Sequence, residues 1–176
     1  MKRTKFALAI VGFLICGSLT ARNGEVKMRE GTITLPAYRV NAPEKAPLFE
    51  RDFAYQRAKR GVYPYAMNDN PTDEKIDTTY RALFLENDYL EVCVLPDIGG
   101  RLFYATDKTN GYEIFYRQHV IKPANVGMLG AWISGGVEWN VFHHHRATSN
   151  IPCDYRIVEN GDGSKTIWVG ETELRH

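Results

Sequence analysis

Residues 80–117, YRALFLENDYLEVCVLPDIGGRLFYATDKTNGYEIFYR, decide the fold. Apolar, aromatic and β-branched residues form short runs in this stretch, and each run ends in a turn signal. Asn87-Asp88 supplies a tight turn, Gly99-Gly100 can adopt positive φ, and Asn110-Gly111 is the strongest short signal for a hairpin. The pattern therefore predicts antiparallel strands at 80–86, 90–95, 101–106 and 112–117.

The flanking segments extend this series of strands. Residues 153–159 and 165–173 enclose the polar turn 160–164, which predicts a further hairpin. Residues 32–40 predict a first strand, and Pro36 within it favours an edge position because proline cannot donate to a β-ladder. Short strands that recur between polar turns predict an all-β fold, most simply an antiparallel β-sandwich.

The N-terminal third of the chain is less regular. Residues 22–30 are polar and predicted to be flexible, residues 49–60 have a weak helical pattern, and residues 61–77 are predicted to be loop. We therefore divide the chain into a signal peptide (1–21), an N-terminal segment of strand and loops (22–79), and part of a β-sandwich (80–176).

The first 21 residues have the pattern of a secretory signal peptide. Lys2, Arg3 and Lys5 precede an apolar run over residues 6–19, and small residues follow as far as Ala21. The run is shorter than the roughly 18 residues that cross a bilayer. We therefore expect no membrane span and export to the periplasm or beyond.

Composition narrows the choice of partner. The chain has 22 basic and 21 acidic side chains, and this balance argues against binding to nucleic acid. Its 44% hydrophobic and 12% aromatic content is sufficient for a packed core. Export would permit a disulfide between Cys93 and Cys153, but their places in the sequence leave open whether they pair.

Residues 120–149, VIKPANVGMLGAWISGGVEWNVFHHHRATS, have the composition of a ligand site. Gly135-Gly136 allows close approach of another group. Trp132 and Trp139 offer flat apolar faces that could stack on sugar C–H surfaces, or they could equally be core residues. Polar side chains among them could hydrogen-bond to hydroxyl groups.

The triplet at 143–145 and the nearby Glu138 are the candidates for acid–base chemistry. In an extended chain His143 and His145 share one face, and with Glu138 they could bind a metal, contact a polar ligand or be structural. Glu138 is the only acid of the stretch, and a structural interpretation pairs it with Arg101 or Arg146. We predict catalytic roles for Glu138, His143 and His145, substrate contacts for Arg101, Trp132, Trp139, Asn140, His144 and Arg146, and no metal or cofactor.

The amino-acid sequence resembles the N-terminal part of the bacterial "domain of unknown function 5107" family. The resemblance rests on residues 85–149 and continues through TITLPAYRV (32–40), GVYPYAMND (61–69) and ENGDGSKTIWVGETELRH (159–176). This family is similar to galactose mutarotase-like proteins, which share turns of the form LPDIGGRL, found here at 95–102.

The resemblance implies an exported protein that binds or processes carbohydrate, such as a glycoside hydrolase or an aldose epimerase. Members of the family are usually longer, so the chain resembles an N-terminal fragment that would be inactive alone. A non-catalytic sugar-binding module and an inactive truncated product are the alternatives. The expected ligand is a carbohydrate.

Overall fold

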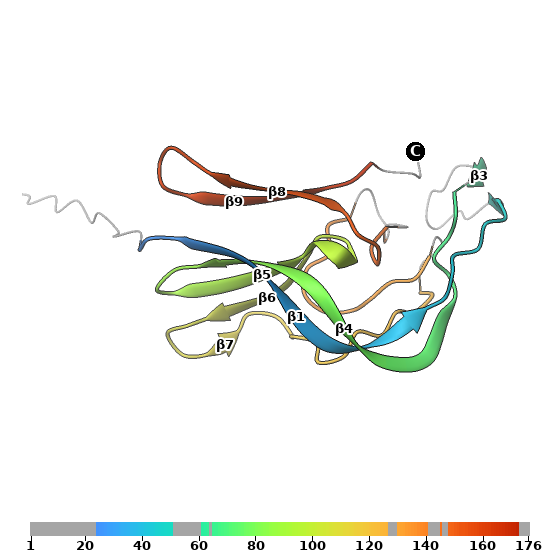
Figure 1. The fold of residues 1–176 in the computed structure, drawn as a ribbon, viewed down its shortest axis with the longest axis horizontal. Coiled ribbons are helices and arrows are strands. Elements are labelled where there is room, and N and C mark those ends of the chain that lie inside the picture. Colours follow the sequence, from blue (N-terminus) through green and yellow to red (C-terminus); the bar gives the residue numbers. More distant parts are fainter. Residues whose placement is uncertain are drawn as a thin grey trace, which may run out of the picture.

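The structure, a computed structural model, describes residues 24–50, 61–63, 65–126, 130–140, 145 and 148–172, with the backbone alone at 48–50 and 61–63. Its strands form a five-stranded sheet in the order β1-β4-β5-β6-β7 and two-stranded sheets β2-β3 and β8-β9 (Figure 1). The strands are β1 (Lys27–Val40), β2 (Leu48–Glu50), β3 (Gly61–Tyr63), β4 (Pro71–Glu86), β5 (Leu90–Leu95), β6 (Arg101–Asp107), β7 (Tyr112–Glu113), β8 (Asp154–Glu159) and β9 (Lys165–Gly170).

The predicted all-β class is confirmed. Every pair of named strands is antiparallel, and the only helical segment among the described residues is the 3-10 turn η2 (Pro96–Ile98). Figure 1 shows the β8–β9 hairpin lying across the five-stranded sheet as a second layer. Two antiparallel layers that pack face to face through their apolar side chains form a sandwich, so the architecture is sandwich-like.

The long β1–β4 pair forms one edge of the main sheet. Its register runs from Lys27 opposite Glu86 to Val40 opposite Pro71, and Figure 1 shows both strands curving strongly. The edge position that Pro36 predicted is confirmed, because β1 is the first strand of the five-stranded sheet. On its outer side β1 makes a parallel bridge from Ala37 to Ile121, in which the Pro36 carbonyl accepts from the Ile121 N–H at 3.0 Å.

Three predictions for the N-terminal part were wrong. Residues 27–30 belong to β1 although they were predicted to be flexible, and 71–77 belong to β4 although they were predicted to be loop. Residues 48–50 and 61–63 pair as β2 and β3, where the start of a weak helix and a loop were expected, and residues 51–60 of that predicted helix lie outside the described residues. These segments carry many polar residues, and their strand conformation depends on partners far away in the sequence.

The turns of residues 80–117 are confirmed. Gly99, Gly100 and Gly111 all have positive φ, and β4–β5 and β6–β7 are hairpins. The last strand is shorter than expected: β7 ends at Glu113, and residues 114–117 leave the sheet. The backbone N–H of Ile114 still donates to the carbonyl of Ala105, at 2.8 Å, so the departure begins immediately after that bond.

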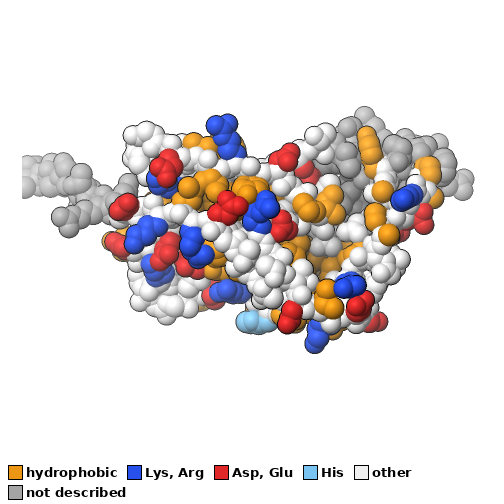
Figure 2. Space-filling model, in the orientation of Figure 1, with side chains coloured by type: hydrophobic (Ala, Val, Ile, Leu, Met, Phe, Trp, Pro, Cys, Tyr) orange, Lys and Arg blue, Asp and Glu red, His pale blue; other side chains and the backbone are white. Residues whose placement is uncertain are grey.

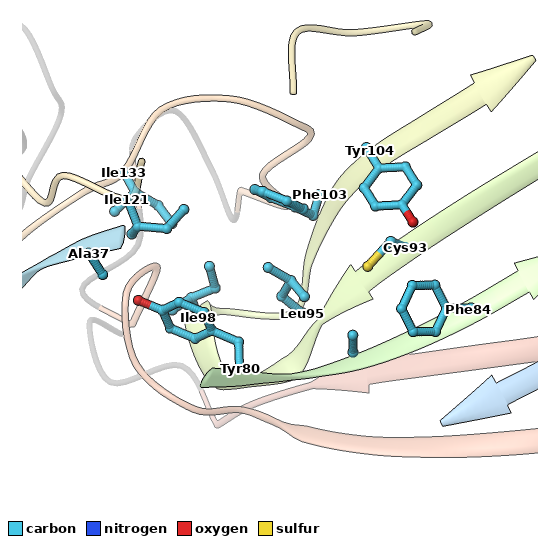
Figure 3. Packing of buried hydrophobic residues seen from close by; sticks show 11 residues of the cluster. Ala37, Tyr80, Phe84, Cys93, Leu95, Ile98, Phe103, Tyr104, Ile121 and Ile133 are labelled. Carbon is cyan, nitrogen blue, oxygen red and sulfur yellow. The ribbon is translucent and has the colours of Figure 1, made fainter. Parts of the chain in front are cut away.

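The hydrophobic core lies on one face of the main sheet. Figure 3 shows Phe84, Cys93 and Tyr104 side by side on neighbouring strands, and Ile121 and Ile133 beside Ala37 at the other end of the same cluster. Burial raises the pKa of the Cys93 thiol to about 12. No disulfide joins Cys93 and Cys153 in the structure.

The β8–β9 hairpin contacts the opposite face. A Cβ on Gly100 would lie 2.8 Å from the Cβ of Val169 and 2.9 Å from the Sγ of Cys153, so glycine lets the β5–β6 turn approach the hairpin. The hydroxyl of Tyr155 donates to Oε1 of Glu30 at 2.7 Å. These contacts hold the second layer against the first.

Candidate functional site

The segment that carries the candidate site is attached to the start of β6. The N–H and C=O groups of Leu102 and Val137 bond to each other at 3.2 and 2.9 Å. Gly136 precedes this bridge with φ +61°, and a Cβ there would overlap the carbonyl oxygen of Leu102. The predicted role of Gly135-Gly136 in close backbone approach is therefore confirmed, and the bridge places Glu138 at the edge of the core.

Glu138 is the centre of a three-residue cluster. The indole N–H of Trp132 donates to Oε2 of Glu138 at 2.9 Å, and Nδ1 of His145 lies 2.6 Å from the same oxygen. The Glu138 side chain is only 9% exposed. Its other oxygen, Oε1, is buried and has no hydrogen-bond partner in the part of the chain that the structure describes. Buried carboxylate oxygens are normally paired, so Oε1 is an acceptor whose partner does not lie among the described residues.

The cluster orients the His145 ring. In the tautomer with the hydrogen on Nδ1, the ring donates to Oε2 of Glu138. Proton exchange with a ligand would then proceed through Nε2. The rings of Trp132 and His145 are tilted by 40° with centroids 4.8 Å apart, which further restrains the imidazole.

The structure brings together Glu138, His145 and Trp132 among the predicted site residues. Trp139 is 50% exposed and lines a different, apolar cavity of about 400 Å³ between the sheet and β9. Leu102 and Val169 contribute to the walls of that cavity. Trp132 and Trp139 therefore lie in different environments, although both were predicted to contact the substrate.

Arg101 has a structural position. It is buried, and its Nη1 donates to the carbonyl of Gly135 at 2.5 Å. This bond fixes the loop next to Glu138, so Arg101 supports the segment that carries the cluster. The structural interpretation paired Glu138 with Arg101 or Arg146, whereas the described partners of Glu138 are Trp132 and His145. Asn140 is exposed, and the predicted residues His143, His144 and Arg146 lie outside the described residues.

The described residues contain no group of three or more His, Cys, Asp and Glu side chains that could hold a metal ion. The alternative metal site at 143–145 included His143, which lies outside this part of the chain. No helix within the described ranges is long and apolar enough to cross a membrane. The proposed signal peptide, residues 1–21, also lies outside the described residues.

Sequence reasoning missed a second group of polar side chains. Tyr80, Asp97 and Thr148 line one cavity although they belong to β4, η2 and the loop before β8. No sequence motif contains all three residues, because Tyr80 and Thr148 are 68 positions apart (148 − 80 = 68). Of the three residues, only Asp97 lies in a recognisable turn motif, LPDIGGRL at 95–102.

Comparisons with known proteins agree with this fold. The chain is similar to the crystal structure of a TPR-domain containing protein from Parabacteroides distasonis ATCC 8503, with 26% sequence identity and a TM-score of 0.64. The match covers 78% of this chain and 23% of that chain, so the chain spans about a quarter of the length of the solved protein. A profile of the family described as Domain of unknown function (DUF5107) matches residues 57–176, which is more than half of the sequence. The chain belongs to the DUF5107 family.

Proposed function

We propose that the chain binds carbohydrate and contributes to carbohydrate processing at the Glu138 cluster, as part of an exported protein with a galactose mutarotase-like domain. The observation that carries this proposal is the buried Glu138 carboxylate, with Oε2 shared by Trp132 and His145 and Oε1 without a described partner. A sugar hydroxyl is a donor that Oε1 can accept.

The cluster contains the parts that acid–base chemistry on a sugar requires. Glu138 holds the His145 ring through Nδ1, so Nε2 of the neutral ring can take a proton from a sugar hydroxyl, and the imidazolium formed in this way can give the proton to a ring or glycosidic oxygen. Such a reaction also needs a second group that takes a proton or activates water. We assign no residue of this chain to that second role.

The test compares three variants of the purified chain in calorimetric titrations with a glycan panel, and in polarimetric and p-nitrophenyl glycoside assays. We expect Glu138→Gln to lower turnover by about 10²–10⁴-fold, because it removes the charge that stabilises a protonated His145. Glu113→Gln is the matched control, since Glu113 also has one bonded carboxylate oxygen and one buried oxygen without a described partner. We expect the control to behave as wild type.

A non-catalytic sugar-binding module is the second candidate, and the half-exposed Trp139 favours it. In that case no panel member is turned over, Glu138→Gln leaves binding intact, and Trp139→Ala weakens binding about fivefold through lost stacking. If no member of the panel is bound or turned over by the wild-type chain, both forms of the proposal are wrong.

Export is tested separately by expressing the chain with its own N-terminus in a bacterium. We expect the periplasmic product to begin at Arg22, because Ala21 ends the proposed signal peptide. N-terminal sequencing of the fractionated protein checks this. A product that stays in the cytoplasm with residues 1–21 attached would contradict it.

A further inference from the structure

A further cavity among the described residues lies away from the Glu138 cluster. It has a volume of about 640 Å³, within the range of about 300–1,000 Å³ that is typical of small-molecule sites. Its walls come from the curved β1–β4 pair, η2 and the loop 148–151, and Glu138, Trp132 and His145 do not line it. Figure 2 shows hydrophobic side chains gathered in the concavity of that curved pair.

The polar groups of the cavity come from buried or partly buried side chains. Tyr80 is 9% exposed, and in Figure 3 its ring packs in the core while its hydroxyl points toward the side of Ala37. Burial, opposed by a hydrogen bond from Thr78, raises the pKa of Tyr80, so the phenol remains a neutral donor and acceptor at physiological pH. The backbone N–H of Arg81 donates to Oδ2 of Asp97 at 2.6 Å and so fixes this carboxylate beside the cavity.

Thr148 supplies a second, independent observation. The residue lines the cavity and is only 7% exposed, and its Oγ1 is buried without a hydrogen-bond partner in the described part of the chain. A buried hydroxyl without a partner is uncommon, and it is satisfied when a ligand or water supplies a donor or acceptor. Thr148 therefore adds a hydroxyl with unused hydrogen-bonding capacity to the residues that line the cavity.

The charges of the cavity indicate a neutral ligand. The charged side chains that line it are Asp97 and Arg39, and Arg39 Nε lies 3.5 Å from Oε1 of Glu74. An anionic ligand would therefore meet a carboxylate and a guanidinium that already has a partner. The remaining polar groups are hydroxyls, a phenol and amides, which both donate and accept hydrogen bonds as sugar hydroxyls do. Aliphatic walls such as Ile76 and Ile98 suit the C–H faces of a sugar ring.

We propose that this cavity is a second carbohydrate site, which takes a neutral saccharide through Tyr80, Asp97 and Thr148. The ligand class is the same as in the proposed function, but the site rests on different residues. A chain with both sites would hold a saccharide away from Glu138 and His145, and so would add affinity to the binding at the Glu138 cluster.

The test titrates the chain with glucose, galactose, mannose, xylose, N-acetylglucosamine, cellobiose, maltose and lactose by calorimetry and saturation-transfer NMR. We expect Thr148→Val and Tyr80→Phe each to weaken binding of the bound sugar about tenfold, because each removes a hydroxyl contact. Thr148→Val should leave the melting temperature unchanged or raise it, since the hydroxyl has no described partner to lose. This variant therefore separates a binding role from a folding role.

The control is Thr106→Val, because the hydroxyl of Thr106 donates to Glu113 and lies outside the cavity. We expect it and Glu138→Gln to leave the binding at this site unchanged. Binding that depends on Glu138 and is insensitive to Thr148→Val and Tyr80→Phe overturns the second site and leaves the proposed function standing. Absence of binding to all eight sugars overturns the second site, whereas the glycan panel and the turnover assays decide the proposed function.

Discussion

Replacing Gly136 with alanine is expected to lower the free energy of unfolding by about 3 kcal/mol, through strain of the left-handed backbone and overpacking. Gly136 has φ +61°, and a Cβ would overlap the Leu102 carbonyl oxygen and lie 3.0 Å from that of Phe103. These atoms belong to the backbone of β6 and cannot rotate away. Urea denaturation followed by circular dichroism measures the loss.

Gly163→Ala is the matched control for this prediction. Gly163 also has positive φ, at +86°, but nothing lies within 4 Å of a Cβ there. Gly163→Ala should therefore lower the free energy of unfolding by about 1 kcal/mol, through backbone strain alone. Equal losses in the two variants would show that the approach of residue 136 to β6 is not tight. Because the bridge from Leu102 to Val137 places Glu138, Gly136→Ala should also impair any activity of the Glu138 cluster.

Phe103→Ala is expected to destabilise the chain by about 3–5 kcal/mol, the usual cost of removing a buried aromatic ring. Phe103 is 1% exposed and belongs to the core cluster, where its ring lies 6.1 Å from that of Tyr104 in an edge-on contact. Removal of the ring would leave a void between the sheet and the loop that contains Ile133. Chemical denaturation at several protein concentrations checks the value and excludes association as its cause.

Tyr112→Ala is the control for the core substitution. Tyr112 lies in the neighbouring strand β7 but is 64% exposed, so its loss should change stability by no more than about 0.5 kcal/mol. A small effect of Phe103→Ala, similar to that of this control, would show that the core is not organised around β6.

The success of sequence reasoning depended on the distance between partners. The β4–β5, β6–β7 and β8–β9 hairpins could be predicted because each turn lies between the strands that it joins. The first half of β4 could not, because polar residues such as Lys75 and Asp77 adopt a strand only by pairing with β1. That pairing joins segments more than thirty residues apart, as Val40 opposite Pro71 shows.

The candidate site divides in the same way. Glu138, His145 and Trp132 lie within one short stretch of unusual composition, so the sequence could select them together. The separation of Trp139 from them, and the support role of Arg101 beneath Gly135, depend on which side of the loop faces β6. The cavity with Tyr80 and Thr148 could not be predicted from the sequence, because its walls come from segments that are far apart in the chain.

For this protein, the amino-acid sequence by itself determined the all-β class, the positions of the turns and the stretch that contains the Glu138 cluster. Turn chemistry and alternation act over a few residues, so they are legible without a partner. The tertiary structure alone decided which oxygen of Glu138 is shared, which tryptophan joins it, and where a cavity opens beneath the curved β1–β4 pair. These features arise when burial brings distant segments together, and the energy of such contacts belongs to no single stretch of the chain.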